Sequence, residues 1–83
     1  MPNASEIVQI NARLERVFQS VFRLPNLKIH PGMTRDDIRA WDSLTHVELI
    51  VTVEKEFGVR FRLEEIKSLK SVGAILEALQ MKL

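Results

Sequence analysis

Apolar residues recur along much of the chain at the spacing of an α-helix. In residues 5–22 they stand three or four positions apart and form one stripe, made of Ile7, Ile10, Leu14, Val17, Phe18 and Val21. Asn3 followed three residues later by Glu6 is the pattern of a capping box, with Ser5 as an alternative cap. Pro25 cannot continue a helix. The pattern therefore predicts a first helix over residues 5–22.

Residues 43–57 form a second predicted helix, which begins at Asp42 or Ser43 and ends before Gly58. One face has the pattern of a core face and carries Leu49, Ile50, Val53 and Phe57. A neighbouring face is also apolar and carries Leu44, Val47 and Val51. The β-branched residues would permit a strand, but the charges of Glu48 and of Glu54-Lys55-Glu56 favour a helix. This helix therefore has more apolar surface than its own burial requires.

The remaining segments complete a small helical fold. The helical spacing of apolar residues is absent from residues 24–41, which are predicted to form a long loop with one short helical turn at 34–37. We expect this loop to pack on the core through Leu27, Ile29, Met33 and Ile38. Residues 59–62 read as an extended connector that Val59 and Phe61 anchor, and Leu63–Leu69 as a short helix. Ser71 then caps a last helix that contains Val72, Ile75, Leu76 and Leu79. The prediction is one all-α domain over residues 1–83, a small four-helix bundle of three main helices and one short helix.

Composition narrows the classes of function. The chain has 83 residues, of which 46% are hydrophobic and 28% charged, a normal balance for one small globular domain. It has no cysteine, which excludes disulfides and thiolate metal sites. Neither a signal-peptide pattern nor a membrane-length apolar run is present, so we expect a soluble, cytoplasmic, monomeric protein without membrane insertion. A net charge of +1 gives no case for nucleic-acid binding.

The charges are unevenly distributed. Residues 1–41 carry six basic and four acidic groups, and residues 58–70 carry four basic and two acidic groups. Residues 42–57 reverse this balance, with four acidic groups, Asp42, Glu48, Glu54 and Glu56, against Lys55 alone. A partner with a basic face would be steered to the second helix.

Ser43 is the main candidate for chemistry. It lies in the first turn of the second helix, where the positive end of the helix dipole favours an attached phosphate, but a serine there can also be a simple helix cap. A Ser43–His46 dyad fits the spacing, yet no oxyanion-hole motif accompanies it, and we expect His46 to be a solvated surface residue. His30 is expected to be exposed, neither histidine has a second ligand at metal spacing, and Trp41 is expected to be a hydrophobic plug.

Residues 41–61 resemble the signature of acyl carrier proteins. The resemblance rests on Asp-Ser-Leu at residues 42–44, Glu48-Leu49, and Glu54 followed three residues later by Phe57 on the same predicted helix. The order of helices and the length of the chain also match that family. The resemblance implies that Ser43 receives 4′-phosphopantetheine from coenzyme A through a separate phosphopantetheinyl transferase with Mg²⁺. The chain would then be no enzyme but a carrier of acyl thioesters, its helices sheltering the acyl chain.

The same resemblance implies roles for the neighbours of Ser43. Asp42 would help to present Ser43 to basic residues of the transferase. Leu44, Val47 and Val51 match exposed apolar positions of the family that bind partners. Glu48 and Glu54 match acidic positions that meet basic docking patches on acyl-loading and acyl-processing enzymes. The sequence also departs from the family. Ala40-Trp41 stands where a glycine commonly precedes Asp-Ser-Leu. At three later positions, residues that are often acidic or neutral in the family are replaced by Thr45, His46 and Lys55. The whole chain is also slightly basic. The resemblance implies a carrier for fatty-acid, specialised lipid or polyketide biosynthesis. These differences make a specialised carrier, for a dedicated lipid, polyketide or peptide-type pathway, at least as good an interpretation as the main fatty-acid carrier.

Two alternatives to an acyl carrier stay open on the sequence. A peptidyl or aminoacyl carrier would use the same attachment chemistry on Ser43. An unmodified helical interaction module would use Ser43 only as a cap and would bind a basic partner through its acidic helix. The first alternative differs from an acyl carrier in cargo, and the second differs in whether Ser43 is modified at all.

Overall fold

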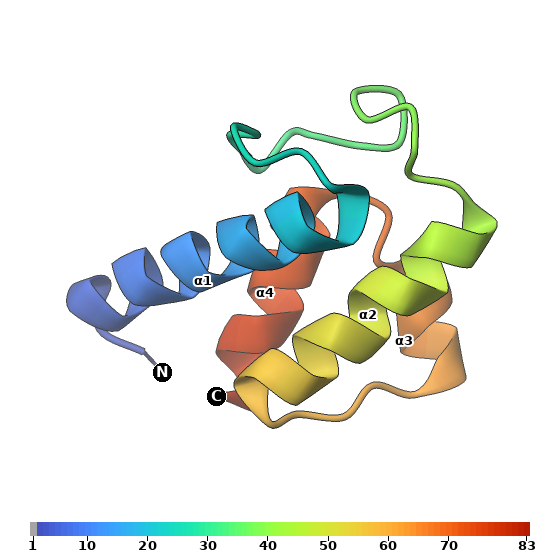
Figure 1. Ribbon diagram of the computed structural model, residues 1–83. Coiled ribbons are helices and arrows are strands. Elements are labelled where there is room, and N and C mark those ends of the chain that lie inside the picture. The colour runs from blue at the N-terminus through green and yellow to red at the C-terminus, as the bar shows by residue number, and fades with distance from the viewer. Residues whose placement is uncertain (1) are drawn as a thin grey trace.

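The computed structural model describes residues 2–83 and shows four helices in that range. They are α1 (Ala4–Phe22), α2 (Ser43–Phe57), α3 (Leu63–Ser68) and α4 (Val72–Lys82). The predicted order and number of helices are confirmed, with bounds that differ by one residue at the start of α1 and at the end of α3. Figure 1 shows the long loop after α1 crossing one end of the bundle before it enters α2.

The first helix begins with the predicted capping box. The Glu6 amide donates to the Asn3 side chain at 2.9 Å, and the Asn3 amide donates to the Glu6 carboxylate at 3.5 Å, so Asn3 and not Ser5 is the cap. The helix ends at Arg23, which adopts a left-handed conformation with φ 57°. Pro25 follows two residues later, where it prevents the chain from resuming the helix.

The core is formed by the inward faces of α1, α2 and α4. α1 packs mainly against α2 and less extensively against α4. The fully buried side chains are led by Phe18, Leu14, Leu49, Ile50, Ile75 and Leu79. Burial of each such side chain stabilises the fold by about 1.5–3 kcal/mol relative to its exposed state. The core face that the sequence predicts for the second helix is confirmed, since all four of its residues are buried.

The long loop is attached to the helices and does contact the core. Met33 and Ile38 are buried, while Leu27 and Ile29 are partly buried against the core. The predicted short helical turn at residues 34–37 is a hydrogen-bonded turn, in which the Asp37 amide donates to the Thr34 carbonyl at 3.0 Å. Because the loop is held to the core at several points, its backbone follows a defined path to the start of α2.

Three backbone contacts join this loop to the start of α4. The Val72 amide donates to the Met33 carbonyl at 2.9 Å, the Gly73 amide donates to the Pro31 carbonyl at 2.9 Å, and Thr34 pairs with Ser71 as an isolated bridge. A Cβ atom at Gly73 would lie 2.9 Å from the Pro31 carbonyl oxygen, which is too close for any other residue without a shift of the backbone. The loop and α4 therefore approach each other at a position where glycine is required.

The connector between α2 and α3 is extended, as predicted. Gly58 ends α2 in a left-handed conformation with φ 66°, Val59 is half-buried and Phe61 is buried. The Phe61 amide donates to Glu54 Oε2 at 2.8 Å. This side-chain hydrogen bond takes the place of a partner strand, which the described residues do not provide at this segment.

Candidate functional site

The start of α2 is capped by Asp42. Its Oδ1 atom accepts hydrogen bonds from the amides of Leu44 and Thr45 at 3.0 and 2.9 Å, and the Thr45 hydroxyl accepts one from the Asp42 amide at 2.8 Å. This reciprocal pattern is a capping box in which Thr45 takes the usual place of Glu or Gln. Interpreting Ser43 as the helix cap is therefore wrong, because Asp42 already performs that function.

Ser43 is the first residue within α2, and it is exposed. Across residues 2–83 the Ser43 hydroxyl has no hydrogen-bond partner, so no structural role occupies it. The N-terminal end of a helix carries a partial positive charge that stabilises an adjacent phosphate. The geometry therefore presents a free alcohol at a position that favours a phosphate ester.

The carboxyl group of Asp42 is held in its charged form. Its pKa lies below the ordinary value because the Thr45 backbone amide donates to it, with further contributions from the Thr45 hydroxyl, the Leu44 amide and the positive charge of Arg35. Asp42 therefore places a fixed negative charge directly before Ser43. Such a charge can attract basic residues of a modifying enzyme.

His46 is buried, and the expectation of a solvated surface histidine is wrong. The Trp41 indole N–H donates to His46 Nδ1 at 3.0 Å, and His46 Nε2 lies 2.9 Å from the Ile66 carbonyl oxygen. An indole can only donate and a carbonyl can only accept, so the tautomer that satisfies both contacts carries its proton on Nε2. We call this chain of hydrogen bonds the Trp41–His46–Ile66 clip.

The clip removes the basis for a catalytic dyad. Both nitrogens of His46 are bonded to partners other than Ser43, so the ring has no free base to offer the serine. The sequence contained a signal for this burial: His46, Ile50, Val53 and Phe57 follow one another at spacings of four, three and four, and the last three form the core face. The polar ring therefore belongs to that face, where its partners come from other segments.

Trp41 is the predicted hydrophobic plug. It is 2% exposed, and its ring packs edge-on against Phe18 with 5.4 Å between centroids and against Phe22 with 6.0 Å. Its indole N–H anchors the clip, which connects the loop before α2 to the carbonyl of Ile66 in α3. Trp41 and His46 thus determine how the chain enters α2 and where α3 lies beside it.

The second apolar face that the sequence predicts for α2, beside its core face, is exposed to solvent. The exposed fractions of Leu44, Val47 and Val51 are 79%, 53% and 42%, and Glu48 is exposed beside them. Clustered apolar side chains with a polar margin are typical of a protein-binding surface. We call Leu44, Val47, Glu48 and Val51 the outward face of α2.

Glu54 lies in different surroundings from Glu48. It is half-buried, and its carboxylate accepts the hydrogen bond from the Phe61 amide that holds the connector to α3. Glu56 forms an ion pair with Arg13 at 2.9 Å, which joins α2 to α1. Of the acidic residues in α2, only Glu48 has neither an ion-pair nor a hydrogen-bond partner for its side chain within residues 2–83.

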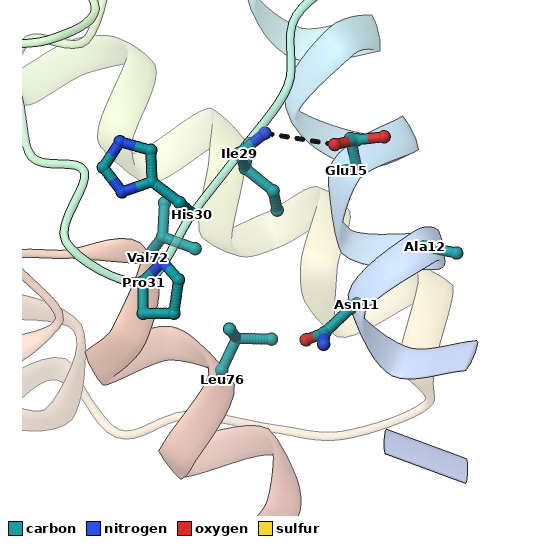
Figure 2. Close-up of a pocket in the computed structure, with 8 residues that line it drawn as sticks. All are labelled: Asn11, Ala12, Glu15, Ile29, His30, Pro31, Val72 and Leu76. Atoms are coloured by element: carbon teal, nitrogen blue, oxygen red, sulfur yellow. Dashed lines mark hydrogen bonds between the residues drawn. The ribbon is translucent and has the colours of Figure 1, made fainter. Parts of the chain in front are cut away.

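A cavity of about 240 Å³ lies elsewhere, between α1, the long loop and α4 (Figure 2). Ile29, Val72 and Leu76 form apolar parts of its wall. Glu15 also lines it, and one of its carboxylate oxygens accepts a hydrogen bond from the Ile29 amide at 3.1 Å. No lining residue comes from α2, so this cavity is not built by the helix that carries Ser43.

Residues 2–83 contain neither a cluster of metal-ligating side chains nor a helix suited to crossing a membrane. No three histidine, cysteine, aspartate or glutamate side chains gather there in a way that could hold a metal ion. None of the helices in the described range combines the length and the apolar character needed to cross a membrane. His30 is exposed, as expected.

Comparison with known proteins decides the family. A family model described as "Phosphopantetheine attachment site" matches residues 12–79, a range that includes the whole of α2. The chain is 44% identical over 81 residues to an acyl carrier protein of Thermosynechococcus vestitus, covering 96% of this chain and 95% of the relative. It belongs to the acyl carrier protein family. An acyl carrier protein of Acidothermus cellulolyticus is 35% identical over 65 residues, covering 78% and 77% of the two chains.

The fold agrees with this assignment. The solution NMR structure of a holo acyl carrier protein from Geobacter metallireducens superposes with a TM-score of 0.80 at 34% identity, covering 88% of this chain and 83% of that one. The chain is therefore a carrier and not an enzyme, and its prosthetic group is covalently attached 4′-phosphopantetheine. The start of α2 fits such a group, because Ser43 offers a free, exposed hydroxyl at a helix N-terminus.

Proposed function

We propose that Ser43 is the attachment point and that the chain carries acyl groups for a specialised lipid or polyketide pathway. The observation that supports the attachment point is the division of roles at the start of α2: Asp42 caps the helix, which leaves the Ser43 hydroxyl exposed and without a partner. The prosthetic group supplies the thiol on which acyl groups are held as thioesters, a group that this chain, which has no cysteine, cannot provide.

The attachment reaction needs only an alcohol from this chain. The Ser43 oxygen forms a bond to the phosphorus that bears the pantetheine of coenzyme A, and the bond from that phosphorus to the nucleotide phosphate breaks. Adenosine 3′,5′-bisphosphate leaves, and the hydroxyl proton passes to a base of the transferase. Ser43 lies where the helix dipole stabilises the new phosphodiester, and Asp42 keeps the serine in place through the capping box.

The outward face of α2 is the proposed docking surface for the transferase and for acyl-loading and acyl-processing enzymes. Leu44 and Val47 would contribute apolar contacts close to Ser43, and Val51 would extend them along the helix. Glu48 would meet basic residues of the partners, as would Asp42. Glu54 was expected to act in the same way, and we propose only a minor share for it because its carboxylate already holds the connector to α3.

The departures from the housekeeping pattern support a specialised pathway. Trp41 and His46 are two of the residues at which the sequence departs from the family pattern, and both form hydrogen bonds in the clip. The chain as a whole has a net charge of +1, so acidic character is confined to part of its surface. Client enzymes would therefore have to recognise the outward face itself and not a generally acidic protein.

The attachment point is tested by intact-mass measurement. Incubation with coenzyme A, Mg²⁺ and a promiscuous phosphopantetheinyl transferase should add one phosphopantetheine group to the wild type. Ser43→Ala should abolish the addition, while Ser20→Ala, which changes another exposed helical serine, should not. A wild type that stays unmodified would refute the proposal and would favour the unmodified interaction module. A modified Ser43→Ala variant would refute Ser43 as the attachment point. The mass of the group carried by protein from its native host would distinguish acyl from aminoacyl cargo.

A further inference from the structure

A basic depression lies between the long loop, α3 and the segment that leads into α4, and the carrier function does not use it. It is an open hollow of about 460 Å³, lined by Thr34, Arg35, Asp36, Lys67 and Lys70. Three of these five residues are cationic, and only Asp36 is acidic. None of the three cations forms an ion pair with a carboxylate within residues 2–83. We call this hollow the basic depression.

The fold brings these cations together from distant parts of the sequence. Arg35 lies in the long loop, which is joined to the start of α4 by the Thr34–Ser71 bridge and by the Val72–Met33 hydrogen bond. Lys70 directly precedes Ser71, so the same contacts hold it beside the loop. Lys67 follows Ile66, whose carbonyl is bonded to His46 in α2. The arrangement depends on well-defined backbone contacts and not on flexible side chains alone.

The same contacts place the basic depression close to Ser43. Arg35 is near enough to Asp42 for its charge to help lower the pKa of that carboxyl group, and Asp42 is adjacent to Ser43. On the other side, Lys67 is one residue from the Ile66 carbonyl that contacts His46, which lies one turn after Ser43 in α2. The loop that carries Arg35 and the helix α3 that carries Lys67 are therefore both linked to the first turns of α2, where an arm on Ser43 would begin.

We propose that the basic depression binds an oxyanion carried on the arm of Ser43. This inference rests on Ser43 being the attachment point. Two sources share the required chemistry: the phosphodiester of the arm itself, and a carboxylate at the far end of the carried group. Lysine and arginine side chains form charge-assisted hydrogen bonds with both kinds of oxyanion. In either case the depression would hold the arm against the protein, and in the second it would select for a dicarboxylic acyl group.

The test compares four forms of the protein by amide NMR. They are the unmodified chain, the holo form, and forms loaded from butyryl- and succinyl-coenzyme A, which have four-carbon acyl groups that differ in a terminal carboxylate. Binding of the phosphodiester predicts amide shifts at Arg35, Lys67 and Lys70 that arise in the holo form and persist in both acyl forms. Binding of the carboxylate predicts shifts that arise only in the succinyl form. High salt should reduce either set, because exposed charges are screened.

Matched variants show whether the shifts depend on these cations. A double variant, Lys67→Gln with Lys70→Gln, should lose the shifts, whereas Lys28→Gln with Lys55→Gln, two exposed lysines outside the basic depression, should keep them. The proposal fails if the loaded forms leave the depression unshifted, as they would if it served an acidic protein partner. It also fails if both double variants behave alike. Intact mass reports loading separately: a chain that cannot be loaded refutes the attachment proposal as well, whereas a loaded chain without shifts refutes only this one.

Discussion

The outward face of α2 and its inward face, which packs on the core, take their residues from the same short stretch of sequence but have opposite surroundings. The outward face carries Leu44 and Val47, which are more than half exposed. The inward face carries His46 and Leu49, which are buried. Neighbouring residues therefore differ in function, because a helix turns each successive side chain by about 100°. The inward face attaches α2 to the bundle, and this leaves the outward face free for partners.

The two ends of α2 differ in a similar way. Nearer its start, the side chains of Ser43 and Glu48 have no hydrogen-bond or ion-pair partner within residues 2–83. Towards its end, Glu54 holds the connector to α3, and Glu56 pairs with Arg13, whose guanidinium also lies over the Phe57 ring at 4.4 Å. The acidic side chain of α2 that has no such partner is thus the one nearest to Ser43. This difference can be tested by paired substitutions.

The largest effect is expected from a matched pair of leucines. Leu49→Ala removes a fully buried side chain and should lower the free energy of unfolding by about 2–5 kcal/mol, through lost burial and a cavity. Leu44→Ala, on the outward face, should change the free energy of unfolding by less than about 0.5 kcal/mol. Urea denaturation measures both values. If Leu44 is a docking residue, its replacement should instead lower kcat/KM of the transferase by roughly fivefold or more.

A smaller loss of stability is expected from His46→Ala. This change leaves the buried Trp41 N–H without its acceptor, which costs about 1–3 kcal/mol. The Ile66 carbonyl also loses its partner, at a smaller cost because that contact is only part-buried. Denaturation followed by Trp41 fluorescence measures the loss. Val47→Ala, at the next residue but on the outward face, is the control and should leave stability nearly unchanged. Equal stability of the two variants would contradict the structural role of the clip.

Glu54 and Glu48 provide the third comparison. Glu54→Ala removes the acceptor for the Phe61 amide and should lower the free energy of unfolding by about 1 kcal/mol. Glu48→Ala should leave stability within about 0.5 kcal/mol of wild type, because its side chain has no bonded partner in the described chain. Rates of transfer to a client enzyme should show the reverse order, with the larger defect in Glu48→Ala. A larger transfer defect in Glu54→Ala would show that our division of α2 is wrong.

The smallest effect concerns the pH dependence of the cap. Because the pKa of Asp42 is lowered in the folded state, its charged form stabilises the fold fully above the ordinary value of 3.8, and the contribution is lost as the pH falls through the lowered pKa. Asp42→Asn keeps a good cap without a titrating group. Urea midpoints of the two proteins, compared across this acid range, should converge as the pH falls. Parallel curves would contradict the assignment to Asp42.

Much of the fold could be predicted from the sequence because its signals are local. The apolar stripe of α1, the Asn3–Glu6 capping box and the Ser71 cap each depend on residues within a few positions of one another. The position of Ser43 in the first turn of α2 and the second apolar face beside it follow from the same periodicity. These features require no knowledge of what lies across the bundle.

Other features of the site could not be predicted because they depend on residues that are far apart in the chain. The choice of Asp42 over Ser43 as the cap is an exception: it is local, but both residue types permit it and the geometry of the turn decides. His46 has a partner twenty residues away in Ile66, and the cations of the basic depression come from the long loop and from the region of α3 and α4. Only the total basic excess of residues 58–70 hinted at that cluster.

The sequence by itself determined the helices, the family and the candidate serine, because periodicity, caps and a short motif are properties of adjacent residues. Tertiary structure alone decided which polar side chains are free to act. It buried His46, bonded Glu54 to the connector and left the Ser43 hydroxyl without a hydrogen-bond partner in the described chain, residues 2–83. The physical reason is that a buried polar group must find a hydrogen-bond partner, and that partner is supplied by whichever segment the fold brings beside it.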